Sequence, residues 1–259
     1  MFFVYFATAT NAVSIAKTLE QAGVYWVSGG STPVEVTAWD YPHWVAHIAY
    51  DGFAAGSFTA DQLIKALPAA GQGKIIALQS RVDDPPDAER WQGLQKILND
   101  NPGVQLVQWD SAQGDLTTAH DAVRAMMASH PDVNGVWAEN DDMALGALQA
   151  LKELALEGEV KVVGCDGKFD MLEAIKDGLA AATVLNDGKY QAELSLAMAL
   201  AARQRKLDVV SLPHKNRMFE ICGVSVDANN ADQVIRDYID ATPSYDLTGF
   251  FLRWSVALE

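Results

Sequence analysis

The stretch KIIALQSRVDDPPDAERWQGLQKIL, residues 74–98, decides the fold. It opens with a continuous apolar run, KIIALQ (74–79), which is typical of a strand buried on both faces. After a polar loop, apolar residues recur every three or four positions, as they do on one face of an amphipathic helix. A buried strand followed by an amphipathic helix is the repeating unit of a parallel α/β sheet.

The same alternation continues on both sides of this stretch. We expect further strands at 2–6, 24–28, 44–49, 104–109, 135–139, 160–165, 182–184 and 218–226. Helical periodicity between and after them predicts helices at 11–22, 54–67, 116–127, 143–151, 169–178, 189–203 and 231–239. The predicted fold class is therefore α/β, with doubly wound parallel sheets.

Composition sets limits on size and partners. A chain of 259 residues with 49% hydrophobic content is long enough for two domains. Its 19 Lys and Arg against 34 Asp and Glu give a net charge of −15, with no local basic cluster. Such a surface repels phosphate backbones, so nucleic acid is not the expected partner. No apolar run approaches the roughly 18 residues of a membrane span, and the apolar start is interpreted as a strand.

Catalytic signatures are missing from the sequence. There is no nucleophile elbow, no phosphate-binding P-loop and no dinucleotide fingerprint, so we expect no catalytic residues and no cofactor. His43 and His47 have the spacing of zinc ligands on a helix but lie in or beside a predicted strand, and no metal site is predicted. Cys165 and Cys222 sit in apolar runs and are interpreted as buried free thiols.

Polar residues follow three successive strands: Asn140, Asp166 and Asn186. Taken singly, each has a local explanation, such as an N-cap at Asn140-Asp141, for which Asp141 is the expected cap, or a tight turn at Asp166. Carboxyl ends of parallel strands converge at one edge of a sheet, where ligands bind. With Arg90 near the start of a predicted helix, these residues predict a polar site for a small molecule.

The stretches 74–98, AENDDMALGALQAL (138–151) and VVGCDGKFDMLEAIKDGLAAATV (162–184) resemble the type I periplasmic binding proteins, in particular the ribose-binding-like branch. The resemblance is ordered and runs over most of the chain. It implies two Rossmann-like lobes joined by three crossing segments, which close on a sugar or sugar alcohol. It also implies a periplasmic protein that delivers this ligand to an ABC transporter permease and catalyses no reaction.

Carried over position by position, the resemblance implies ligand binding by Arg90, Asn140, Asp166 and Asn186. Guanidinium, carboxylate and amide groups suit a sugar, whose hydroxyls both donate and accept hydrogen bonds. The family's Asp-Arg pair, however, is replaced here within Ser28-Gly29-Gly30, and two of its aromatic positions hold Gly114 and Cys165. We therefore expect a reshaped pocket, for which Trp39, Trp44 or Trp91 are candidate stacking rings.

The resemblance begins at the family's third strand, so the first two β-α units have no counterpart and we expect an incomplete N-lobe with an unpaired strand edge. The predicted division gives residues 1–50 and 187–215 to the N-lobe, and 51–186 and 216–259 to the C-lobe. Hinge crossings are expected near 50–51, 186–187 and 212–217.

Two alternative functions remain open at this point. One is the sugar-responsive effector domain of a repressor-type transcription regulator, and the other is an enzyme built on a doubly wound sheet.

Overall fold

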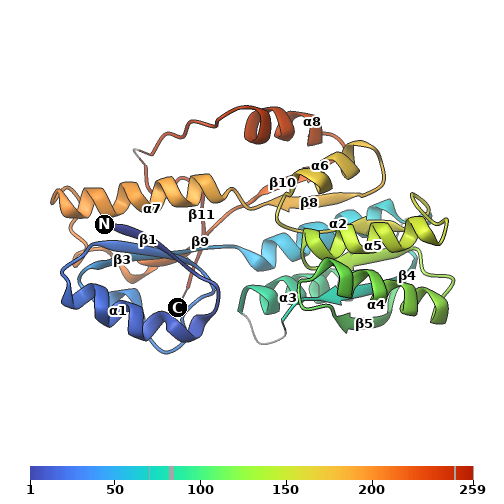
Figure 1. Cartoon of the computed structure of the whole chain (residues 1–259), viewed down its shortest axis with the longest axis horizontal. Coiled ribbons are helices and arrows are strands. Elements are labelled where there is room, and N and C mark those ends of the chain that lie inside the picture. Colours follow the sequence, from blue (N-terminus) through green and yellow to red (C-terminus); the bar gives the residue numbers. More distant parts are fainter. Residues whose placement is uncertain (70, 82–84, 248, 259) are drawn as a thin grey trace.

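A computed structural model describes residues 1–69, 71–81, 85–247 and 249–258. Within them the chain forms two lobes side by side, each built on one sheet (Figure 1). The first lobe has the strand order β1-β2-β3-β9-β11, in which only β11 is antiparallel to its neighbour. Its strands are β1 (Phe2–Phe6), β2 (Trp26–Gly30), β3 (Trp44–Tyr50), β9 (Met218–Ile221) and β11 (Trp254–Ala257), and its helices are α1 (Ala12–Gln21) and α7 (Gly188–Arg203).

The sheet of the second lobe has the order β10-β8-β7-β6-β4-β5, antiparallel only at β10. Its strands are β4 (Gly73–Gln79), β5 (Val104–Ser111), β6 (Gly135–Ala138), β7 (Lys161–Val163), β8 (Ala182–Leu185) and β10 (Val224–Asp227). Its helices are α2 (Gly52–Ala66), α3 (Pro85–Asp100), α4 (Leu116–Ser129), α5 (Asp141–Glu153), α6 (Phe169–Lys176), α8 (Ala231–Val234) and the π-helical turn Ile235–Asp240. The predicted doubly wound α/β class is confirmed.

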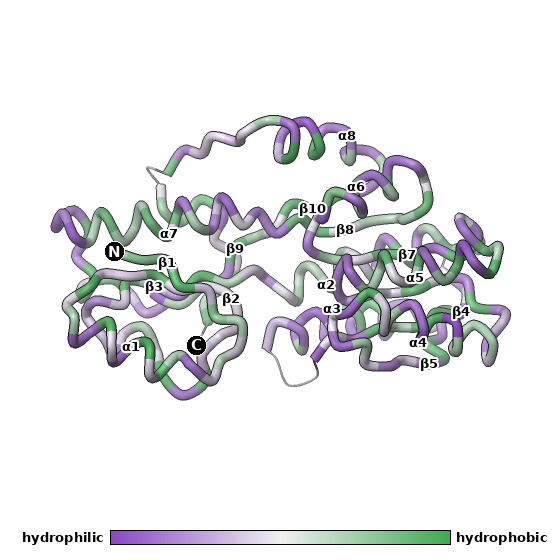
Figure 2. Tube along the Cα trace, in the orientation of Figure 1, coloured by the Kyte–Doolittle hydropathy of each residue, from purple (hydrophilic) through white to green (hydrophobic). Residues whose placement is uncertain are grey.

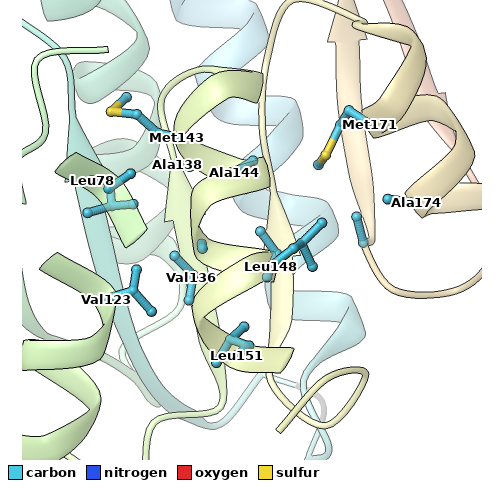
Figure 3. Packing of buried hydrophobic residues seen from close by; sticks show 14 of the residues in the cluster. Leu78, Val123, Val136, Ala138, Met143, Ala144, Leu148, Leu151, Met171 and Ala174 are labelled. Carbon is cyan, nitrogen blue, oxygen red and sulfur yellow. The ribbon is translucent and has the colours of Figure 1, made fainter. Parts of the chain in front are cut away.

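Period-two alternation explains why helices cover both faces of the second sheet. On β4, Ile75 and Ala77 pack with α2 and α3, whereas Ile76 and Leu78 pack with α4 and α5. Figure 3 shows the second of these clusters, in which side chains from β4, α4, β6, α5 and α6 gather in one core. The strands are apolar on both faces, as the continuous hydrophobic runs in the sequence predicted.

The first lobe also has a core on each face of its sheet. On the α1 face, the rings of Trp26 and Trp44 stack with centroids 4.6 Å apart, and Phe6 meets both edge-on. The α7 face holds Ile48 and Phe219 against Leu194. Aromatic packing on this scale stabilises the lobe through large buried areas, with about 0.5–1.5 kcal/mol per ring pair beyond the area term.

Strand β1 forms the outer edge of this sheet, and among the described strands it pairs only with β2. Figure 2 colours most of β1 as hydrophobic, and Phe2 and Tyr5 are 53% and 66% exposed. The expected apolar strand edge is therefore present.

The C-terminal tail departs from the predicted division. Residues 216–259 were assigned to the second lobe, but β9 and β11 pair in the first sheet and only β10 pairs in the second. The run MFEICGVSV, expected as one strand, is thus two strands in different sheets. The third crossing lies at Cys222-Gly223 rather than at 212–217, where a short 3-10 turn (His214–Asn216) leads directly into β9.

A close backbone approach explains where this run breaks. A Cβ on Gly223 would lie 2.5 Å from Cγ1 of Val184, so only glycine fits beside β8. Beyond the turn Ile235–Asp240, residues 241–247 and 249–253 arch back over the molecule to β11 (Figure 1) and form a further crossing between the lobes of the described chain. We call residues 241–247 and 249–253 the C-terminal strap. Among the described helices, none has the length and apolar character needed to span a bilayer.

Candidate functional site

A cleft of about 520 Å³ lies between the two lobes. The first lobe contributes the carboxyl ends of its parallel strands, including Tyr5 and Phe6 at the end of β1 and Tyr50 at the end of β3. All four predicted site residues line the same cleft from the second lobe or the crossing segment: Arg90, Asn140, Asp166 and Asn186. The structure thus brings together the residues that the strand-end argument selected.

Arg90 projects from the first turns of α3 and lies at the centre of this group. Its Nη2 donates to Oδ1 of Asp166 at 3.3 Å, and its Nη1 donates to the carbonyl oxygen of Glu139 at 3.1 Å. The Arg90 side chain is only 13% exposed. A guanidinium fixed from two directions presents its remaining N–H groups in a set orientation, which suits recognition of neighbouring ligand oxygens.

Asp166 follows β7 with an unusual backbone. Its φ of +133° is rare for a residue with a side chain, and strain of this kind gathers at functional sites. Burial raises the pKa of the carboxyl, and the charges of Arg90 and Lys168 oppose that rise. Asn186 donates from Nδ2 to the same Oδ1 at 3.3 Å. Asp166 is therefore held by two neighbours while about a third of its side chain stays exposed in the cleft.

Asn140 has both a structural role and a place in the cleft. Its Oδ1 accepts from the backbone N–H of Met143 at 2.9 Å, so Asn140 is the N-cap of α5. The expectation that Asp141 is the cap was wrong. Asp141 is fully buried inside the first turn, where it accepts from the Thr183 hydroxyl and the Lys168 N–H at 2.7 Å each. Asn140 also lines the cleft, and the cap bond engages its Oδ1 rather than its Nδ2.

None of the three proposed tryptophans lines the cleft. Trp44 is fully buried, Trp91 packs with two other tryptophans, and Trp39 stacks on His214 with centroids 4.2 Å apart. These rings cannot stack on a ligand in the cleft, because they pack against the hydrophobic cores of the two lobes instead. The aromatic residues that do line the cleft are Tyr5, Phe6 and Tyr50.

Gly29 and Gly30, where the resemblance led us to expect an Asp-Arg pair, leave no room for side chains. A Cβ on Gly29 would lie 2.8 Å from Nε2 of Gln191, and one on Gly30 would lie 2.4 Å from the carbonyl oxygen of Phe6. Gln191 of α7 lines the cleft at this place, and its Nε2 donates to the carbonyl oxygen of Ile48 at 2.8 Å. The Gln191 amide thus occupies part of the space into which a side chain at position 29 would extend.

The remaining singled-out residues have structural surroundings. His43 Nδ1 lies 2.8 Å from Oε1 of Glu20, and His47 Nδ1 lies 2.9 Å from the Ser28 hydroxyl. The described residues contain no group of three or more His, Cys, Asp or Glu side chains that could hold a metal ion. Cys165 is buried as expected, whereas Cys222 is exposed because it lies in the crossing segment rather than inside a strand.

Several cleft residues were missed by the sequence reasoning. Tyr5, Phe6 and Tyr50 lie at the carboxyl ends of parallel strands of the first lobe, so the strand-end rule would have found them had it been applied to both sheets. Asp87 lies one helical turn before Arg90 on α3, a spacing that places both on one face. No sequence signal marks Gln191, which reaches the cleft only because α7 packs against β2 and β3.

Comparisons with known proteins agree with this architecture. A family model described as a periplasmic binding protein domain matches residues 4–207. A xylitol-binding protein of Mycolicibacterium smegmatis is 33% identical over 163 residues, covering 62% of this chain and 46% of that protein. The ribose import binding protein of Salmonella typhimurium is 38% identical over 141 residues, covering 54% of this chain and 46% of that protein. These matches span about half the length of those curated relatives.

A crystal structure of a twin-arginine translocation pathway signal protein from Burkholderia phytofirmans is 33% identical to this chain. It superposes with a TM-score of 0.91 over 99% of this chain and 79% of that one. The family model covers well over half of the sequence, and the TM-score shows that the two-lobed architecture described above is shared with the Burkholderia phytofirmans protein. The chain therefore belongs to the periplasmic binding protein domain family.

Proposed function

We propose that this chain is the solute-binding protein of an ABC-type carbohydrate uptake system, and that it binds a monosaccharide or sugar alcohol between its lobes. In this proposal it works in the periplasm, delivers its ligand to a transporter permease and catalyses no reaction. The observation that carries the proposal is a cluster in which Arg90 and Asn186 both donate to Asp166, at a cleft lined by both lobes.

The chemistry of the cleft suits a small polyhydroxylated ligand. Its volume of about 520 Å³ falls in the usual range of about 300–1,000 Å³ for small-molecule sites. A polyol offers little apolar surface, so its affinity must come from hydrogen bonds to fixed donors and acceptors in a site that excludes water. Arg90 and the amides of Asn140 and Asn186 supply donors, and Asp166 supplies an acceptor.

The relatives' names support the transport role. One is called a xylitol-binding protein and another a ribose import binding protein, and both names describe the binding of a small polyol or sugar. They favour an import binding protein over the effector domain of a repressor.

A ligand screen tests the proposal. Thermal shifts of the protein with ribose, xylitol, allose and other neutral sugars and polyols should identify at least one stabilising ligand, because binding to the folded state alone raises the melting temperature. Calorimetry should then give a one-to-one stoichiometry. If no neutral sugar or polyol binds while a different ligand class does, the proposed function is contradicted.

A further inference from the structure

Asp87 presents a second carboxylate to the cleft, on the same helix as Arg90. It lies in the first turn of α3 and lines the cleft. Its Oδ2 accepts from the backbone N–H of Arg81 at 3.0 Å. A carboxylate has about four acceptor positions, so this bond leaves capacity for others.

The buried side chain of Glu139 lies against Asp87. Glu139 directly follows β6 and is fully buried. Its Oε2 accepts from the backbone N–H of Ser80 at 2.6 Å, whereas its Oε1 receives no N–H or O–H group from the described residues. The side-chain contact of Glu139 is with the Asp87 carboxyl.

Two carboxyl groups in contact attract one another only when one carries a proton. Glu139 is the one that holds it, because Glu139 is wholly buried while Asp87 faces the cleft and accepts from an N–H group. Burial raises the pKa of Glu139 to about 9, and the negative charge of Asp87 contributes to that rise. The opposing influences are the Ser80 N–H and the positive charge of Arg90. A pKa of about 9 favours the neutral acid at neutral pH, and a neutral Glu139 carries an O–H group that suits donation to Asp87.

We propose, resting on the function proposed above, that Asp87 is a further ligand-contacting residue and that protonated Glu139 is its positioning residue. Asp87 accepts a hydrogen bond from a ligand hydroxyl, and the O–H of Glu139 fixes its orientation. The site therefore selects an uncharged ligand with a hydroxyl donor beside Asp87.

The balance of charges in the cleft narrows the ligand class. Among the residues that the structure describes, the negative side chains that line the cleft are Asp51, Asp87 and Asp166, and the positive ones are Arg81 and Arg90. A sugar acid or sugar phosphate would place an anion between Asp87 and Asp166, both of which must instead meet donors. We therefore expect neutral sugars and polyols to bind, and their acid and phosphate derivatives to be excluded.

Calorimetry with three variants tests this inference, with xylitol, ribose, allose and myo-inositol as neutral probes, and ribonate and ribose 5-phosphate as anionic probes. Asp87→Asn should weaken the best neutral probe about 10- to 100-fold, the usual loss for a hydrogen bond to a charged group. Asp100→Asn is the control, because this exposed aspartate lies at the far end of the same helix and pairs only with Lys96 among the interactions described for it.

The variant Glu139→Gln distinguishes the effect of the Glu139 proton from the effect of its side-chain packing. The glutamine amide can donate to Asp87 and accept from Ser80 as the neutral acid does, but it does not titrate. At about pH 7 this variant should bind within about threefold of the parent protein, and between about pH 7 and pH 10 only the parent should lose about 10-fold in affinity.

The outcomes are distinguishable. If the parent binds a neutral probe but Asp87→Asn behaves like Asp100→Asn, the inference is overturned and the proposed function stands. Equal pH profiles for the parent and Glu139→Gln would overturn the role of Glu139. Tight binding of ribonate or ribose 5-phosphate would overturn the ligand class. If the parent binds no neutral probe, the proposed function fails and this inference fails with it.

Discussion

His47 places an imidazole in the interior of the first lobe. The side chain is fully buried in β3, where Nδ1 lies 2.9 Å from the Ser28 hydroxyl and Phe6 stacks on the ring. Its Nε2 has no hydrogen-bond partner among the described residues. Burial lowers the pKa of His47 from 6.5 to about 3, because no nearby acid compensates a buried positive charge.

This residue should make the protein acid-sensitive. Between 6.5 and about 3 the unfolded chain binds a proton at His47 and the folded chain does not, so the free energy of unfolding falls as the pH drops through this window. His47→Gln removes the titration, and urea denaturation should show a smaller loss of stability for the variant than for the parent. Equal losses in both proteins would show that His47 carries a proton in the folded state.

At this scale, the sequence predicted which polar residues lie together at the cleft better than it predicted their individual contacts. Arg90 and Asp166 could be selected because strand ends and helix starts converge in a parallel sheet. The proximity of Asp87 to Glu139 could not be predicted from the sequence, since it depends on how the start of α3 is positioned relative to the end of β6. The choice of Asn140 over Asp141 as the N-cap follows from burial of Asp141 against Thr183, which is distant in sequence.

At the scale of elements, α5 shows how periodicity translates into packing. Leu151 is fully buried in the core of the second lobe, whereas Leu154, three residues later, is 38% exposed at the end of the helix. Leu151→Ala should lower the free energy of unfolding by about 2–5 kcal/mol, because it removes buried methyl groups and leaves a cavity. Leu154→Ala is the matched control and should cost less than about 1 kcal/mol. Comparable losses in chemical denaturation would contradict the packing described here.

Element boundaries were predictable wherever local pattern decides them, and α7, expected at 189–203, is found at Gly188–Arg203. The boundary inside the run MFEICGVSV (218–226) was not predictable, because both halves are apolar and extended and no local signal separates them. Its division depends on contacts distant in sequence, with β9 beside β3 and β10 beside β8. The strand β11 was missed for the same reason, since the aromatic tail pairs with β9 only after the strap has crossed back.

At the scale of the whole molecule, the C-terminal strap ties the two lobes together near the hinge. Asp187, the N-cap of α7, is 5% exposed. Its carboxylate accepts from the Tyr245 hydroxyl at 2.8 Å and from Nη1 of Arg253 at 3.2 Å. The Arg253 guanidinium also lies 4.0 Å from the ring centroid of Tyr190. A buried carboxylate at a crossing segment is thus held mainly by residues of the strap.

Loss of Arg253 should loosen this attachment. Arg253→Gln leaves the buried Asp187 charge without its cation, which should lower the free energy of unfolding by about 1–3 kcal/mol. It should also speed hydrogen exchange at the start of α7. Arg236→Gln is the control, because Arg236 is exposed and bonds Gln233 within the same helical turn. The strap would not hold the hinge if both variants matched the parent in stability and exchange.

The central claim is that Arg90, Asp166 and Asn186 bind a neutral sugar or polyol between the lobes, and calorimetry of Asp166→Ala tests it most directly. With the best ligand from the screen, the variant should bind about 30- to 1,000-fold more weakly than the parent, because Arg90 and the ligand hydroxyls lose their partner. Asp170→Ala, an exposed aspartate on the neighbouring helix α6, should bind as the parent does. An Asp166→Ala variant with parental affinity would contradict the account.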